Sequence, residues 1–174
     1  MNPLDALMDE IARSGLLSSP QIGDGFIHGT ARIPSAAVDV AVNVDPELDD
    51  YPTPDSTALV AAIRQLLTIT PERWQLITDS IAREIEEAVA DQLIVESTDL
   101  REDLTLTSSV VFHDAILLSF AAPKQFPDSW IRVQLDEDLL VDGVMVDDRD
   151  DDVETMEFDS VDNLLDHLGG IENR

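Results

Sequence analysis

The chain has 174 residues and carries 37 acidic against 10 basic side chains, a formal net charge of −27. Nucleic-acid phosphates and anionic membrane surfaces attract clustered lysine and arginine, so this composition argues against direct binding to either. There are no cysteines, which excludes disulfides and thiolate metal sites. Because no signal-peptide or membrane-spanning pattern is seen either, we expect a cytoplasmic protein.

The first 20 residues are predicted to form a helix and a linker. Asn2 and Pro3 are typical of a helix start, and apolar residues follow at helical spacing as far as Ile11. The Ser- and Pro-containing stretch 18–20 then resembles a linker.

Two strands are expected next, over residues 25–33 and 37–44. Val38, Val40, Val42 and Val44 alternate with smaller or polar residues, the pattern of a half-buried strand. Two helices follow, each opened by a Thr-Pro pair, at Thr53 and at Thr70. Their short connection predicts an antiparallel helical hairpin with apolar faces wide enough to cover a sheet.

The second half is predicted to be rich in strands, followed by an acidic loop and a short helix. The expected strands cover residues 105–112, 115–121, 130–135 and 139–146. The acidic loop covers residues 147–158 and the C-terminal helix and tail residues 159–174. Separate runs of strands and helices favour one α+β domain over residues 1–174. We expect one or two antiparallel sheets of about six strands, packed with the helical hairpin and flanked by short N- and C-terminal helices.

Parts of this pattern resemble bacterial α+β domains of unknown function. The resemblance runs from Val38 to Val146, about two-thirds of the chain. It rests on the strand that ends in residues 40–45, the two-helix segment, the strand 116–120 and the segment 126–136. Such domains have no established catalytic residues, so the resemblance implies a bacterial origin and a fold but no site.

No catalytic, cofactor or metal site is predicted. His28, His113 and His167 lack the spacing of metal ligands, and we interpret them as structural. The run of carboxylates from Asp147 to Glu154 resembles a calcium loop only superficially. Counted from Asp148 as the first position of a calcium-binding EF-hand loop, the required glycine is replaced by valine and the final glutamate by aspartate.

Two surface patches are predicted to bind partners. One combines aromatic rings with positive charge and consists of Lys124, Phe126, Trp130 and Arg132. The other is acidic and consists of Asp147, Asp148, Asp150, Asp151, Asp152 and Glu154. Aromatic and arginine side chains commonly anchor interfaces, whereas an acidic cluster attracts a basic partner.

These features favour a non-enzymatic protein-interaction module that binds a basic protein partner. An immunity or inhibitor protein and a DNA mimic are two versions of that hypothesis. A small-ligand-binding protein, or an enzyme without a recognisable motif, is the main alternative and would need a concave pocket. The acidity could also reflect adaptation of a whole proteome to salt.

Overall fold

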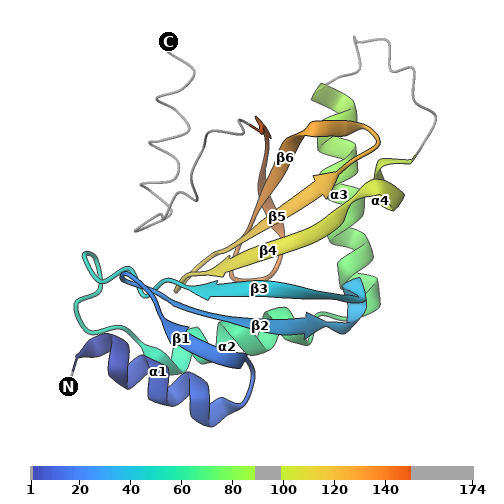
Figure 1. The fold of residues 1–174 in the computed structure, drawn as a ribbon. Helices are drawn as coiled ribbons and strands as arrows, with labels where there is room; N and C mark the ends of the chain where they lie inside the picture. The colour runs from blue at the N-terminus through green and yellow to red at the C-terminus, as the bar shows by residue number, and fades with distance from the viewer. Residues whose placement is uncertain (1, 89–98, 150–174) are drawn as a thin grey trace.

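The computed structural model describes residues 2–88 and 99–149. Its strands form one seven-stranded sheet whose spatial order follows the chain (Figure 1). The strands are β1 (Ser18–Ile22), β2 (Ile27–Ile33), β3 (Val38–Val44), β4 (Thr105–Val111), β5 (Ile116–Ala122), β6 (Phe126–Leu135) and β7 (Val141–Asp148). The helices are α1 (Pro3–Ser14), α2 (Ser56–Leu67), α3 (Pro71–Ala88) and α4 (Leu100–Asp103), with one turn of 3-10 helix, η1 (Pro34–Ala36).

Two antiparallel meanders make up this sheet. Strands β1 to β3 form the first and β4 to β7 the second, and they join through a parallel pairing of β3 with β4. A parallel pair needs a long crossover, which here contains α2, α3 and α4. The predicted α+β class is therefore confirmed, with a mostly antiparallel sheet.

The helix boundaries follow from local sequence signals. The side chain of Asn2 accepts a hydrogen bond from the N–H of Leu4 (3.1 Å) and caps α1. Gly15 ends that helix with φ 69°, a left-handed conformation that favours glycine. Asp55 caps α2 in the same way as Asn2, because its carboxylate accepts the N–H of Ala58 (3.0 Å).

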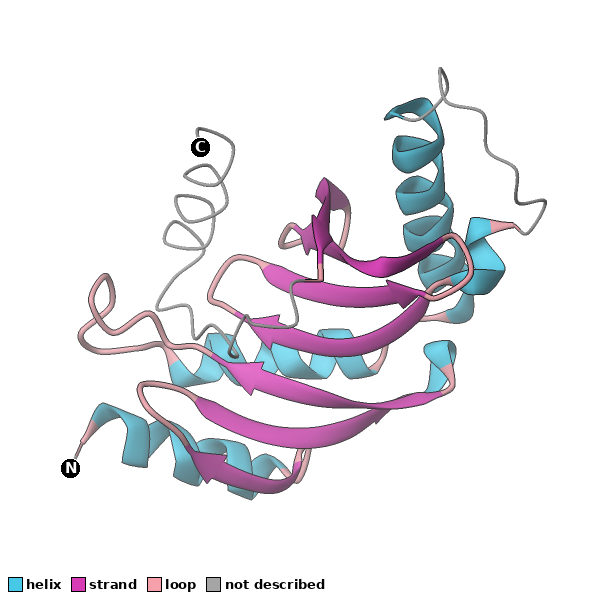
Figure 2. Ribbon diagram, turned by 45° about the horizontal axis from the view of Figure 1, so that its top comes forward, coloured by secondary structure: helices cyan, strands magenta, loops and turns pink. Residues whose placement is uncertain are grey.

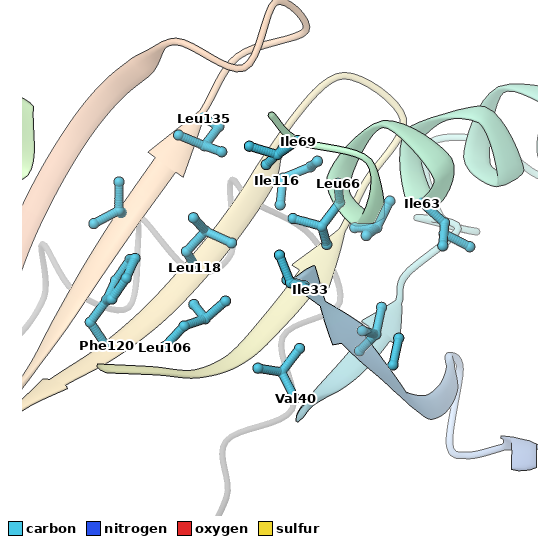
Figure 3. Close-up of a cluster of buried hydrophobic side chains, with 14 of the residues drawn as sticks. Ile33, Val40, Ile63, Leu66, Ile69, Leu106, Ile116, Leu118, Phe120 and Leu135 are labelled. Atoms are coloured by element: carbon cyan, nitrogen blue, oxygen red, sulfur yellow. The ribbon is translucent and has the colours of Figure 1, made fainter. Parts of the chain in front are cut away.

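The hydrophobic core lies between one face of the sheet and the helices (Figure 3). Alternate residues of β2 and β3 are buried on that face, including Ile33 and Val40. Leu118 and Phe120 of β5 extend the same layer, and Leu66 of α2 meets it from the helical side. Period-2 alternation thus determines which face of β2 and β3 is buried.

The two long helices cover different parts of the sheet, so the predicted helical hairpin is wrong. Helix α2 packs beside α1 and against β2 and β4, whereas α3 reaches β7, η1 and α4. They run in different directions, and α2 passes behind the strands (Figure 2). The rings of Trp74 in α3 and Phe120 in β5 lie 5.9 Å apart and dock α3 on the second meander.

Several strands differ from the sequence-based prediction, and β6 begins at Phe126, four residues before its expected start. Residues 18–22, expected to begin as a linker, form the edge strand β1 and bring the strand count to seven rather than about six. The last strand runs from Val141 to Asp148, so it both begins and ends two residues later than expected. The remaining acidic loop, from residue 150, and the predicted C-terminal helix and tail, residues 159–174, lie outside the described residues. No helix in the described ranges is both long and apolar enough to span a membrane.

Candidate functional site

The sheet face opposite the core is the main candidate for a functional surface. Within the described ranges, the helices that pack on the sheet lie on its other side (Figure 2). The strand register places His28, Asn43, Val110 and Leu117 in one row across this open face. Thr30, Ala41, Ser108 and Ser119 form the neighbouring row. Of these eight side chains three are apolar and five are polar, and several are small.

A pocket of about 420 Å³ opens on this face. Strands β1 to β5 all contribute to it, together with residues that flank them. Its lining consists of Ser18, Ser19, Gln21, Phe26, His28, Gly29, Thr30, Ala41, Asn43, Asp45, Val110, Phe112 and Leu117. Ligand sites typically measure about 300–1,000 Å³ and combine apolar walls with a few polar groups, as this pocket does.

The close approach of β1 to β2 helps to shape the pocket wall. At Gly29, an added Cβ would lie 3.1 Å from both the Cβ of Leu17 and the carbonyl oxygen of Ser18. Glycine at this position therefore lets the chain entering β1 pack on β2 more closely than most Cβ atoms would allow. On the floor, the small side chains of Thr30 and Ala41 leave the space that larger residues would fill.

Opposite charges pair across the open face. Arg32 lies 3.5 Å from Asp39, and Arg132 lies 3.0 Å from Asp147. Burial raises the pKa of Asp147, and Arg132 opposes that rise. The two ion pairs neutralise charge on this face, in contrast to the strong acidity of the whole chain.

The predicted aromatic and basic patch is divided in the structure. Trp130 and Arg132 lie on the open face of β6, as their alternation with the buried Ile131 and Val133 requires. Phe126 instead packs against the core, and Lys124 is exposed in the turn before β6. A different arginine completes the aromatic contact, because the guanidinium of Arg149 lies 3.8 Å from the centre of the Trp130 ring.

The predicted acidic patch is only partly described. Asp147 and Asp148 belong to strand β7 rather than to a loop, and Asp147 already pairs with Arg132. Asp150, Asp151, Asp152 and Glu154 lie outside the described residues. The acidic patch therefore stays a prediction.

A second polar cluster lies beside the pocket, where the parallel strands β3 and β4 end. The Nδ1 of His113 lies 3.2 Å from Oε2 of Glu47, and both side chains are 9% exposed. The backbone N–H of Asp55 donates to Nε2 of His113 (3.3 Å), which places the ring proton on Nδ1, facing Glu47. The ring of Tyr51 packs against the imidazole in a tilted arrangement, with the ring centres 4.3 Å apart. Negative charge from Asp114, and then from Glu47, raises the pKa of this tyrosine.

This cluster holds a loop in place and is poorly suited to catalysis. A carboxylate that orients a histidine is typical of a general base, but such a base needs a free Nε2. Here Nε2 accepts a backbone hydrogen bond, so His113 connects the β4–β5 turn to the loop after β3. The geometry fits the prediction that this histidine is structural. Across residues 2–88 and 99–149, no three His, Asp or Glu side chains are arranged to hold a metal ion.

The sequence pattern did not identify the pocket. Its residues come from five strands and from positions 18 to 117, and no local motif joins them. One available signal was the polar side of β3, where Ala41 and Asn43 alternate with buried valines. That pattern predicts a face away from the core, but it does not predict that other elements leave the face open.

No protein-family model matches the chain, and no similar protein was found among curated sequences or solved structures. The interpretation of the site therefore rests on its geometry.

Proposed function

We propose that this protein is a non-enzymatic interaction module that binds a basic protein partner on its open sheet face. The observation that carries the proposal is a sheet face that holds a pocket, combines apolar and polar side chains, and has no described helix packed on it. Apolar area beside hydrogen-bonding groups is typical of the centre of a protein interface. The occupied Nε2 of His113 supports a binding role over a catalytic one.

The charge of the chain supports a basic partner. A net charge of −27 produces a negative potential around the whole molecule, which accelerates the approach of a positively charged protein. Each ion pair on the open face joins one positive and one negative side chain. Specific contact on that face would therefore depend on shape complementarity, apolar burial and hydrogen bonds. Acidity thus favours the encounter, and the open face provides the specific contact.

Affinity capture from the native lysate, with two matched variants, tests this proposal. Ala41→Arg places a long cationic side chain in the pocket, whereas Ala61→Arg makes the same change on exposed helix α2. We expect a basic protein that wild type and Ala61→Arg capture at low salt, and that Ala41→Arg loses. Equal capture by both variants, or equal loss, would contradict an open-face interface. A circular dichroism spectrum of each variant verifies the fold.

A second candidate function is the binding of a small molecule, and the pocket volume favours it. About 420 Å³ is within the range of small-ligand sites. A thermal-shift screen with uncharged compounds tests this candidate. Stabilisation of wild type and Ala61→Arg, but not of Ala41→Arg, would support it over the protein-interaction module.

A further inference from the structure

We infer that the outer edge of β7 binds an extended segment of a partner protein as an added strand, and that this segment alternates apolar with basic residues. The inference goes beyond the proposed function, because it assigns a second contact surface that does not include the pocket. Strand β7 ends the sheet, and within the described ranges it pairs only with β6. Backbone N–H and C=O groups on the outer side of an edge strand can pair with another extended chain.

The two edges of the sheet differ in how well they could accept a strand. At the other edge, β1 has five residues, includes Pro20 and pairs with β2 in an irregular register. Proline lacks the N–H that a neighbouring strand would need, and short or irregular edge strands resist pairing. Strand β7 has eight residues, no proline and a continuous register with β6 from Gly143 to Asp148. Strand addition is therefore favoured at β7.

Strand β7 exposes apolar side chains towards both faces of the sheet. Met145 lies opposite Arg132 of the open face and is 36% exposed. Val146 lies opposite the buried Ile131 and is 41% exposed, and Val144 on the same side packs partly against the core. In the interior of a sheet, side chains on the next strand contact such residues. An added strand with apolar residues on this side would cover Val146 and continue the core beyond β7.

The charge of β7 determines which added strand fits. The strand carries Asp142, Asp147 and Asp148 and no basic residue. Arg132 pairs with Asp147, and the carboxylate of Asp142 lies 3.5 Å from the amide nitrogen of Gln134 on the open-face side of β6. Opposite charges on neighbouring strands stabilise their pairing. Basic residues between the apolar positions of the added strand would therefore complement the carboxylates of β7.

A second copy of the chain fits this edge poorly. Two β7 strands paired antiparallel about a twofold axis near Met145 would set Asp142 opposite Asp147 or Asp148. Like charges directly opposite each other destabilise a pair of strands. Self-pairing would also bring together two chains that each carry a charge of −27. The carboxylates of β7 thus oppose self-pairing and favour a basic partner segment.

Nuclear magnetic resonance titration with a strand-forming peptide tests the inference. The probe is an acetylated and amidated seven-residue peptide that alternates lysine with valine. Its control has the same composition with all lysines placed first, so the charge is equal and the alternation is lost. At constant ionic strength, we expect the probe to shift the amide signals of Met145 and Val146 and to slow their hydrogen exchange. The control should bind about tenfold more weakly. Equal binding of the two peptides, or equal shifts in β1 and β7, would overturn the inference.

Two matched double variants measure the contribution of charge at the edge. Asp142→Asn with Asp148→Asn removes two charges from β7 and should weaken binding of the probe about fivefold. Asp5→Asn with Asp9→Asn removes the same charge from exposed positions of α1, which packs beside β1 at the other end of the sheet. This control should change binding by less than about twofold. Equal effects of the two double variants would contradict charge complementarity at β7.

The edge and the pocket are tested separately. Ala41→Arg changes the pocket, to which β7 contributes no residue, and should leave probe binding unchanged. Loss of probe binding in Ala41→Arg would overturn a separate edge site. A dimer of the free protein in sedimentation experiments that Val146→Lys dissociates would assign the edge to a second copy and also overturn the inference. Partner capture that depends on Ala41, without probe binding at β7, would leave the proposed function standing and refute this inference alone.

Discussion

At the scale of single residues, buried carboxylates serve the fold by accepting backbone hydrogen bonds. Asp103 is 5% exposed, and its carboxylate accepts the N–H groups of Lys124 and Gln125 (3.0 and 2.9 Å). The turn between β5 and β6 is thereby tied to the end of α4. The sequence shows an ordinary Glu-Asp pair at this position, so neither its burial nor its partner some 20 residues away could be predicted.

Replacing Asp103 should destabilise the protein. Asp103→Ala leaves two backbone N–H groups without their acceptor, which should lower the free energy of unfolding by about 1–3 kcal/mol. Asp103→Asn retains one acceptor oxygen and should lower the free energy of unfolding by a smaller amount. The matched control is Glu102→Ala at the exposed neighbouring position, where we expect little change. Urea denaturation measures all three, and an equal cost at positions 102 and 103 would contradict the assigned role.

Two other carboxyl groups should titrate on opposite sides of their ordinary pKa. The backbone N–H and the guanidinium of Arg101 donate to Asp99 and lower its pKa, whereas burial raises the pKa of Asp147. Asp99 therefore stabilises the fold above its ordinary pKa, and this stabilisation is lost as the pH falls through the lowered value. For Asp147 the sign is opposite, because stability declines as the pH rises from the ordinary towards the raised value. Carbon-13 NMR of the side-chain carboxyl groups measures both, and the reverse order would refute this prediction.

At the scale of secondary-structure elements, strong periodicity in the sequence predicted individual strands well. The packing of elements that are distant in the chain could not be predicted in this way. The alternating valines of β3 identified both the strand and its buried face. The stretch Ser18 to Pro20 suggested a linker, and the structure shows no alternation of buried and exposed positions along β1 that could have indicated a strand. The short connection between α2 and α3 suggested a hairpin. Packing against different parts of the sheet determined their directions instead.

The packing of β1 on β2 gives a prediction at this scale. Gly29→Ala brings a methyl group within 3.1 Å of Leu17 and Ser18, and such overpacking typically costs about 1–3 kcal/mol. We expect faster amide hydrogen exchange in β1 as well as lower stability. Gly143→Ala is the control, because its methyl group would meet no atom within 4 Å and stability should hold or rise slightly. Unchanged exchange in β1 of Gly29→Ala would contradict the close-packing argument.

At the scale of the whole molecule, the charge of −27 should oppose folding. Like charges repel more strongly in the compact state than in the unfolded chain. Raising sodium chloride from about 0.01 to 0.15 M shortens the screening length from about 30 to 8 Å, so the melting temperature should rise. The rise should shrink near pH 4, where many carboxyl groups are protonated. A melting temperature independent of salt at pH 7 would mean that acidity costs the fold little.

The net charge of the chain and the open face of the sheet thus have separate proposed roles, one in the encounter with a partner and one in the specific contact. From the sequence, the acidity indicated a basic partner, and the predicted contact was the acidic patch formed by Asp147 and the carboxylates that follow it. In the structure Asp147 pairs with Arg132, and the pocket lies elsewhere on the open face of the sheet. Residues from five strands meet there through sheet register, which no local motif reveals.

Site-specific photo-cross-linking tests the central proposal most directly. A benzoyl-phenylalanine side chain at position 41 lies at the pocket, and the same group at position 61 lies on the exposed side of α2. Irradiation in the native lysate should join a basic protein to position 41 and not to position 61. A basic protein that cross-links at position 61 alone would contradict an interface on the open face.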